Sequence, residues 1–304
     1  MPEYRNQTVT FLTQKFREIG IQPVSKHGQN FLIDMNILNL IVRSADLSRK
    51  DVVLEVGTGT GTLSTRMADQ AGHVVTVEID EHLHQLSMEE LIDFENVTML
   101  QFDVLKNKNN FAPKVLETVK EQLALIPDSN FKLVSNLPYN IATPIISNLL
   151  RTDILPKSMT VTIQKELGER IVARPRTKDY SALSIWMQSQ CDCEIVRILP
   201  PTVFWPRPKV ESAIIHLVLN PKKRARIVDI EFFHKFVRAL FFHRRKFLRN
   251  VLQSAMKGIL EKKEVDAILQ KHKYRKDARA EEFEVEQIIE LAEIFRQAVP
   301  EPEE

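Results

Sequence analysis

A glycine-rich segment near residue 57 is the first candidate for chemistry in this chain. Gly57, Gly59 and Gly61 follow the apolar run VVLEV and precede a segment of helical pattern. Glycine lets the backbone approach a ligand where a side chain would obstruct it. The dinucleotide fingerprint has glycine at its sixth position, where this chain has Thr62, so a ligand without a pyrophosphate fits better. A tight strand-to-helix turn that binds nothing is the alternative.

Two acidic residues stand at the ends of later apolar runs. Glu78 lies 21 positions beyond Gly57, where a carboxylate can accept hydrogen bonds from both ribose hydroxyls and would repel a 2′-phosphate. Asp103 could then accept a hydrogen bond from an adenine amino group. Taken alone, each acid could be a strand-end cap or a solvated loop residue. An adenosine-bearing ligand accounts for the glycines and both acids together.

The segment Asn136-Leu137-Pro138-Tyr139-Asn140 combines amide, proline and aromatic groups directly after another apolar run. The exocyclic amine of a nucleobase is a poor nucleophile because its lone pair is delocalised into the ring, and hydrogen-bond acceptors on its N–H groups localise that pair. We expect the Asn136 side-chain oxygen and the Pro138 carbonyl to be these acceptors. Tyr139 offers a face for stacking, worth about 1–3 kcal/mol per base. A plain turn with a packed tyrosine is the alternative.

Alternating strand and helix patterns must position these residues. Such alternation predicts an α/β domain with a largely parallel sheet, whose ligands bind at the carboxyl ends of the strands. The expected strands are 52–56, 73–79, 97–102, 131–136, 159–164, 193–199 and 212–219. The expected helices are 62–70, 81–92, 112–125, 143–152, 165–174 and 181–190.

After Pro221 the strand patterns stop and helical periods take over. Segments 230–242, 245–256, 263–272 and 284–298 predict a small helical domain. We therefore expect two domains, 1–221 and 222–304, joined by the basic run 222–226, with an acidic tail at the end of the chain.

The charge is distributed unevenly along the chain. Residues 221–280 carry 18 basic and 6 acidic side chains, although the whole chain has a net charge of only +2. A concentrated positive block is typical of a protein that binds a polyanion, although a solvated helix face is the alternative.

Other classes of protein fit the composition poorly. The two cysteines are too few for a disulfide scaffold or a four-ligand zinc site. No apolar run approaches the roughly 18 residues of a membrane-spanning helix. The N-terminus has charged residues where a signal peptide would carry its apolar stretch. We expect a cytoplasmic protein without a membrane association or a metal.

Eight ordered motifs resemble the ribosomal RNA adenine dimethyltransferases that use S-adenosylmethionine, the KsgA-type small-subunit enzymes. The motifs are GQNFLID at 28–34, LEVGTGTG at 54–61, VEID at 77–80, FDVL at 102–105, NLPYNIATPI at 136–145, QKELGERI at 164–171, FWPRPKVESA at 204–213 and FFHRRKFLRN at 241–250. The resemblance implies a Rossmann-like class I methyltransferase sheet of seven strands, the last antiparallel, with a small all-helical C-terminal domain that helps to grip ribosomal RNA.

The resemblance also implies roles for particular residues. Asn30 and Leu32 would close over the cofactor, and Gly57 and Gly59 would line it. Glu78 and Asp103 would hold its ribose and adenine. Asn136 would touch both the cofactor and the target amine, with Pro138 as the second acceptor. Phe204 would enclose the flipped base opposite Tyr139, although a core aromatic residue before a proline turn is the alternative.

Two departures from the family pattern stand out. The connection 106–130 is longer than usual, and Trp205 occupies a position that often holds a smaller residue. Trp205 could be a further stacking surface or a packed ring.

The implied reaction is in-line attack of adenine N6 on a sulfonium methyl group, repeated to give N6,N6-dimethyladenosine at two adjacent positions near the 3′ end of small-subunit RNA. The partner would be this RNA within a pre-ribosomal particle, and we expect the protein to act as a monomer. A cluster of basic residues would form the phosphate-binding rim: Lys222, Lys223, Arg224, Arg244, Arg245, Lys246 and Arg249.

Three alternative functions are open at this point. A related methyltransferase that modifies large-subunit RNA and confers macrolide resistance shares NLPY and the glycine loop. A non-catalytic RNA-binding relative would retain the fold without the activity, and Asn136, Tyr139 and Glu78 argue against it. A nucleotide-dependent oxidoreductase is disfavoured by Thr62.

Overall fold

The computed structural model describes residues 8–18, 20, 30–244 and 246–299. It divides the chain into two compact units, one of residues 1–168 and 194–218 and the other of residues 169–193 and 219–304. Within the described residues, no helix combines the length and the apolar character that crossing a bilayer requires.

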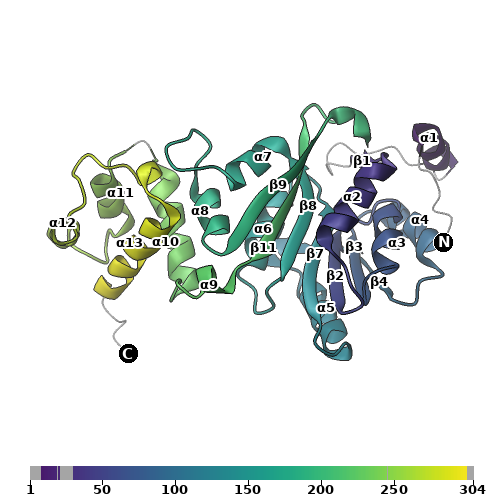
Figure 1. Cartoon of the computed structure of the whole chain (residues 1–304), viewed down its shortest axis with the longest axis horizontal. Helices are drawn as coiled ribbons and strands as arrows, with labels where there is room; N and C mark the ends of the chain where they lie inside the picture. The colour runs from purple at the N-terminus through teal and green to yellow at the C-terminus, as the bar shows by residue number, and fades with distance from the viewer. Residues whose placement is uncertain (1–7, 19, 21–29, 245, 300–304) are drawn as a thin grey trace. The chain divides into compact units, whose positions relative to one another are not determined.

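A seven-stranded sheet in the order β4-β3-β2-β7-β8-β11-β9 organises the chain (Figure 1). Strands β4, β3, β2, β7 and β8 pair in parallel, whereas β11 pairs antiparallel with β8. This confirms the predicted sheet and its antiparallel strand. The strands are β2 (Asp51–Val56), β3 (His73–Glu78), β4 (Val97–Gln101), β7 (Asn130–Asn136), β8 (Ser158–Gln164), β9 (Cys191–Leu199) and β11 (Ser212–Leu219).

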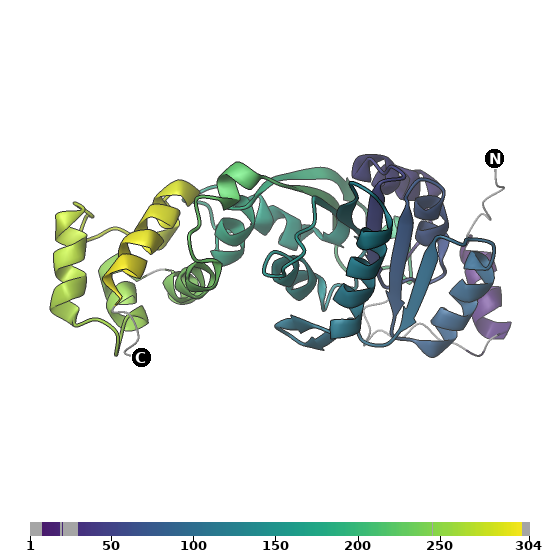
Figure 2. The same ribbon diagram turned by 90° about the horizontal axis from the view of Figure 1, so that it is seen from below.

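Helices cover both faces of the central strands, so these strands are buried along most of their length. Every residue of β2 is buried, as expected of a strand in a doubly covered parallel sheet. Helix α5 lies on one side of the strands, and α3 and α4 lie on the other (Figure 2). The helices of this unit are α2 (Met35–Ala45), α3 (Thr62–Ala68), α4 (Glu81–Leu91), α5 (Pro113–Leu125) and α6 (Ala142–Leu149), and α7 (Lys165–Ile171) extends into the second unit.

Several elements are absent from the sequence-based prediction. Helices α1 (Val9–Glu18) and α2 precede the first predicted strand. The long connection 106–130 contains part of the hairpin β5 (Leu105–Asn107) and β6 (Asn110–Phe111), followed by the predicted helix α5. A short ladder joins β1 (Phe31–Leu32) to β10 (Phe204–Trp205), directly after the 3-10 turn η2 (Pro201–Val203).

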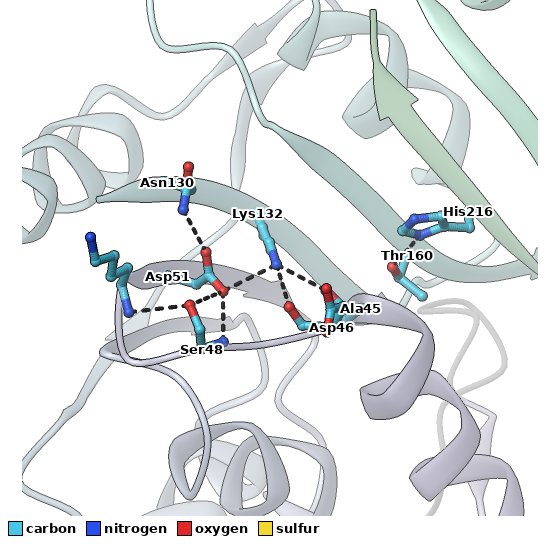
Figure 3. A network of polar contacts seen from close by, with 9 residues as sticks. Ala45, Asp46, Ser48, Asp51, Asn130, Lys132, Thr160 and His216 are labelled. Atoms are coloured by element: carbon cyan, nitrogen blue, oxygen red, sulfur yellow. Dashed lines mark hydrogen bonds and ion pairs between the residues drawn. The ribbon is translucent and has the colours of Figure 1, made fainter. Parts of the chain in front are cut away.

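A buried polar network fastens α2 to the sheet at the end opposite the predicted ligand edge (Figure 3). Lys132 Nζ lies 3.1 Å from the Asp51 carboxylate and donates to the carbonyls of Ala45 and Asp46, which end α2. Ser48 and Asn130 donate to the same carboxylate. Burial alone would raise the pKa of Asp51, but the bonds from Lys132 and Ser48 outweigh it and lower the pKa. These partners compensate both charges for the loss of water.

The second unit is built from helices around an aromatic core. Trp186 of α8 stacks on Phe233 of α10 with ring centroids 6.3 Å apart. Residues 169–193 thereby fold with the C-terminal helices, so this compact unit includes more than the predicted 222–304. The assignment of methyl transfer to residues 1–221 and of RNA binding to residues 222–304 stays a prediction. The helices are α8 (Ala182–Gln188), α9 (Pro221–Arg224), α10 (Ile230–Phe242), α11 (Leu248–Ala255), α12 (Lys262–Lys271), η3 (Ala280–Glu282) and α13 (Val285–Ala298).

The basic run after Pro221 is helical at its start, where the sequence predicts a linker. Asn220 caps α9 by accepting hydrogen bonds from the backbone N–H groups of Lys222 and Lys223, at 3.1 and 3.2 Å. This capping satisfies two of the free donors at the helix start and stabilises the turn.

Candidate active site

A cavity opens at the carboxyl ends of β2, β3, β4 and β7, the edge at which the sequence predicts ligand binding. Its lining includes nine of the predicted site residues: Asn30, Leu32, Gly57, Gly59, Glu78, Asp103, Asn136, Pro138 and Tyr139. Residues from distant parts of the first unit therefore meet around one space.

The glycine loop forms the floor of this cavity. Gly57 and Gly59 have φ values of +84° and +58°, a region that other residues rarely adopt. A Cβ atom on Gly57 would lie 3.4 Å from the Pro138 ring, and one on Gly59 would lie 3.4 Å from the Phe31 ring. The loop therefore packs directly against both the Asn136–Asn140 segment and the β1 segment.

The Glu78 carboxylate is held at the end of β3 by backbone donors. Gly59 N–H donates to Oε2 at 2.9 Å, and Asp80 N–H donates to Oε1 at 3.0 Å. Glu78 is only 5% exposed, and burial raises its pKa while the two backbone bonds act in the opposite direction. Each oxygen keeps a lone pair with which it can accept a ligand hydroxyl.

Asp103 occupies the cavity rim after β4. Its Oδ1 accepts a hydrogen bond from Leu105 N–H at 2.9 Å, which orients the carboxylate within a local turn. Asp103 is exposed, and its Oδ2 accepts no hydrogen bond from the described residues.

Asn136, at the end of β7, has a defined amide orientation. Its Nδ2 donates to the Asn30 carbonyl at 2.8 Å, across 106 residues of sequence. Because the amide nitrogen is bound to the β1 segment, Oδ1 is the atom of this amide that can accept a hydrogen bond from a ligand. This geometry agrees with the acceptor role predicted for Asn136.

Tyr139 is fixed by a partner from β11. Its hydroxyl is 2.6 Å from the Ser212 Oγ, and Ser212 is fully buried. Burial raises the pKa of the Tyr139 hydroxyl, which keeps it neutral. Tyr139 is partly buried and lines the cavity, as a stacking surface requires.

Comparisons with known proteins identify this arrangement. A family model described as ribosomal RNA adenine dimethylase matches residues 22–297. The ribosomal RNA small subunit methyltransferase A of Clostridium acetobutylicum is 37% identical over 272 residues, which cover 88% of this chain and 92% of that protein. The chain belongs to the ribosomal RNA adenine dimethylase family.

Two solved structures share the fold of this ribosomal RNA adenine dimethylase. A dimethyladenosine transferase from Plasmodium falciparum has a TM-score of 0.71 at 22% identity, covering 88% of this chain and 98% of its own. The 23S rRNA methyltransferase ErmE has a TM-score of 0.61 at 26% identity, covering 88% and 100%. The predicted fold, an α/β class I methyltransferase with C-terminal helices, is confirmed. As a member of the family, the chain is an S-adenosylmethionine-dependent rRNA adenine dimethyltransferase.

Phe204 lies in the hydrophobic core of this dimethylase and does not line the cavity. It is 1% exposed, pairs with Leu32 in the β1·β10 ladder and packs among residues of α2 and α3. Trp205 packs on Phe16, with ring centroids 5.5 Å apart. The stacking role of Phe204 stays a prediction, and this packing favours the alternative of a core aromatic residue.

Glu55 is a cavity-lining acid whose role the sequence patterns do not reveal. It is 1% exposed and accepts hydrogen bonds from the hydroxyls of Ser64 and Thr76. Burial raises its pKa to about 8, so the side chain is protonated at neutral pH. The sequence signal that could have found Glu55 is its carboxyl group inside the otherwise apolar run VVLEV.

Four of the predicted phosphate-binding residues form ion pairs or hydrogen bonds with other protein groups. Arg249 forms two bonds with Asp266, at 2.6 and 2.7 Å, and Lys223 lies 2.9 Å from Asp192. Arg224 donates to Gln190, and Arg244 donates to the Lys178 and Tyr180 carbonyls and lies 3.3 Å from Glu281.

The other three predicted phosphate-binding residues have different surroundings. Lys222 and Lys246 are exposed and form no ion pair with the described residues. Arg245 lies outside the described residues. Of the six rim residues that the structure describes, Lys222 and Lys246 are therefore the two whose charge is not used in an ion pair or hydrogen bond.

Proposed function

We propose that this chain transfers methyl groups from S-adenosylmethionine to N6 of two adjacent adenosines near the 3′ end of small-subunit ribosomal RNA, giving N6,N6-dimethyladenosine. Relatives named ribosomal RNA small subunit methyltransferase A, at 37–40% identity, support this substrate over a large-subunit one. The protein acts as a monomer on RNA within a pre-ribosomal particle in the cytoplasm and contributes to small-subunit biogenesis.

The residues at the cavity fit S-adenosylmethionine. The glycines leave a cradle that a Cβ atom would narrow, and the Glu78 carboxylate offers adjacent acceptors suited to two ribose hydroxyls. Asp103 offers an acceptor for the adenine amino group. When bound, S-adenosylmethionine supplies an activated methyl group on a positively charged sulfur.

The orientation of the Asn136 amide is the observation that carries the proposal. The amide nitrogen donates to the Asn30 carbonyl, so the amide oxygen is the atom that can accept a hydrogen bond from a ligand. The glycine loop contacts the neighbouring Pro138. Asn136 Oδ1 and the Pro138 carbonyl accept hydrogen bonds from the two N–H groups of the target amine, which localises the nitrogen lone pair. Tyr139 stacks on the base and restricts its orientation.

The test combines mass mapping with one substitution. Small-subunit RNA from cells lacking this protein should lose two adjacent dimethyladenosines near its 3′ end, and the wild-type gene should restore them. Asn136→Ala should lower methyl transfer by about 10²–10³-fold or more because it removes a preorganised acceptor. Asn109→Ala, on the exposed β5–β6 turn, is the matched control and should restore both modifications.

Two results would contradict the proposal. Full modification of the RNA in cells lacking the protein would exclude the proposed substrate. Wild-type turnover by folded Asn136→Ala would exclude the proposed role of the amide.

A further inference from the structure

Two exposed aromatic rings lie together where α10 ends and α11 begins. Phe242 is 80% exposed and Phe247 is 44% exposed. Among the described residues, the exposed large hydrophobic side chains include only these two aromatic ones. Single exposed apolar side chains are ordinary, but two exposed rings that line one groove indicate a binding surface.

Both rings line one groove between α10 and α11. The groove has a volume of about 770 Å³, and its lining combines the rings with polar and basic groups: Phe242, His243, Lys246, Phe247, Asn250 and Ser254. The His243 ring meets Phe242 edge-on at 4.8 Å, and the Arg279 guanidinium lies 5.8 Å from the centre of the Phe247 ring. We call this surface the α10–α11 groove.

The segment that forms the α10–α11 groove is basic, although Asp266 and Glu281 pair with its Arg249 and Arg244. Residues 232–260, which include every residue lining the groove, contain seven lysines and arginines and no aspartate or glutamate. Such a surface complements a polyanion and disfavours a basic partner.

The groove is held in place before any partner binds. Arg244 donates to the Lys178 and Tyr180 carbonyls and pairs with Glu281, which fastens the connection between the helices. Leu248 N–H donates to the Ala278 carbonyl at 2.7 Å, and Phe247 forms a β-bridge with Arg279. Preorganisation reduces the entropy that binding would otherwise cost.

We infer that the α10–α11 groove binds an unpaired nucleotide of the RNA substrate, with the base stacked on Phe242 and its phosphates near Lys246. The inference rests on the proposed function, because it assumes an RNA substrate. It adds a base contact made by Phe242, which is not one of the predicted phosphate-binding residues and does not line the cavity. Stacking suits any base, so the groove would recognise an unpaired conformation more than a sequence.

The test measures affinity for small ribosomal subunits isolated from cells that lack this protein. Phe242→Ala and Phe242→Leu should each weaken binding about 5- to 150-fold, the loss expected for one stacked base. Phe242→Tyr keeps the ring and should bind as the wild type does. Ile92→Ala is the matched control, because Ile92 is also 80% exposed but lies outside the groove, and it should leave binding unchanged.

Salt dependence separates the ring from the lysine. Phe242→Ala should weaken binding equally at all salt concentrations, whereas Lys246→Ala should flatten the dependence of log Kd on log salt. Ultraviolet crosslinking of the same complex should join an unpaired nucleotide to the peptide that contains Phe242.

Distinct results would overturn the inference. Wild-type affinity of Phe242→Ala would show that the ring contacts nothing. Wild-type affinity of Phe242→Leu, together with loss in Phe242→Ala, would indicate apolar docking of a protein. Absence of methyl transfer by the wild type would instead contradict the proposed function, and the affinity comparison would still test the groove.

Discussion

Tyr139 and Ser212 show how one hydrogen bond between side chains orients a stacking surface. They are 73 residues apart in sequence, and their hydroxyls are 2.6 Å apart. Ser212 begins β11 and pairs with Gln164, the last residue of β8, so the paired ends of these two strands determine the position of the ring. A ring held in this way loses less entropy when a base stacks on it.

Removing either hydroxyl should therefore affect stability and substrate binding together. We expect Tyr139→Phe and Ser212→Ala each to lower the free energy of unfolding by about 1–3 kcal/mol, because each removes one hydroxyl and leaves the other without its hydrogen-bond partner. The double variant should lose less than the sum of the two, since both act on one bond. Urea unfolding and KM for small subunits measure these effects, and strictly additive losses would contradict a shared role.

Glu55 contributes a stability that depends on pH. Its pKa is about 8 in the folded protein and 4.5 for the unperturbed side chain, because burial outweighs the bonds from Ser64 and Thr76 and nearby Glu78 adds to the rise. The folded state therefore binds this proton more tightly than the unfolded state does. The resulting stability is fully present below pH 4.5 and is lost as pH rises towards 8.

Glu55→Gln should remove this dependence. Between pH 5 and 8 the free energy of unfolding of the wild type should fall relative to that of Glu55→Gln by up to about 1.4 kcal/mol per pH unit. Urea unfolding at several pH values measures the difference. Parallel curves for the two proteins would show that Glu55 does not change its ionisation on folding.

At the scale of elements, β7 connects the buried network to the cavity. Lys132, near its first residue, binds the end of α2, and Asn136, its last residue, binds the segment before β1. The chain from Asn30 to Asp46 is thus attached to β7 at both ends. Strand β7 thereby holds the Asn30 segment at the cavity and the end of α2 in fixed positions.

Breaking the buried ion pair should destabilise the first unit strongly. Lys132→Met should lower the free energy of unfolding by about 3–5 kcal/mol, because it leaves the Asp51 carboxylate buried without its countercharge. Adding Asp51→Asn should recover part of the loss. Lys50→Met, which removes an exposed pair with Asp128, is the control and should change stability little. Equal effects of Lys132→Met and Lys50→Met in urea unfolding would refute the network's importance.

For the whole molecule, the excess of basic residues in 221–280 is partly neutralised within the second unit. Asp192, Asp266 and Glu281 pair with Lys223, Arg249 and Arg244. The net charge of a segment therefore overstates the charge that it offers to RNA. Lys222 and Lys246 keep theirs within the part of the chain that is described.

Charge reversal should distinguish these two classes. Lys222→Glu and Lys246→Glu should weaken RNA binding and flatten its salt dependence while leaving S-adenosylmethionine affinity and stability unchanged. Arg249→Glu should in addition lower stability, because it opposes Asp266. Titrations with small subunits at several salt concentrations measure the slopes. An unchanged slope in both lysine variants would favour a solvated surface.

Local sequence patterns were sufficient for much of the fold. Alternating periods predicted the seven strands, and the helix predicted at 230–242 has those bounds in α10. The glycine loop, Glu78 and Asp103 were predictable because strand ends of a parallel sheet share one edge. The β1·β10 ladder was missed because it pairs distant segments. Helices α1 and α2 were missed although their buried apolar residues recur at helical spacing and Asp34 caps α2.

The sequence by itself determined the element types, the edge of the sheet that binds ligand and the residue types available there. Only the tertiary structure decided that the Asn136 amide binds Asn30 and that Phe204 is buried in the core. It also decided that Arg249 is paired, whereas Lys246 forms no ion pair with any described residue. Periodicity reports burial and local conformation, which depend on near neighbours in the chain. Partner choice depends on distances between residues far apart in sequence, and folding alone sets those distances.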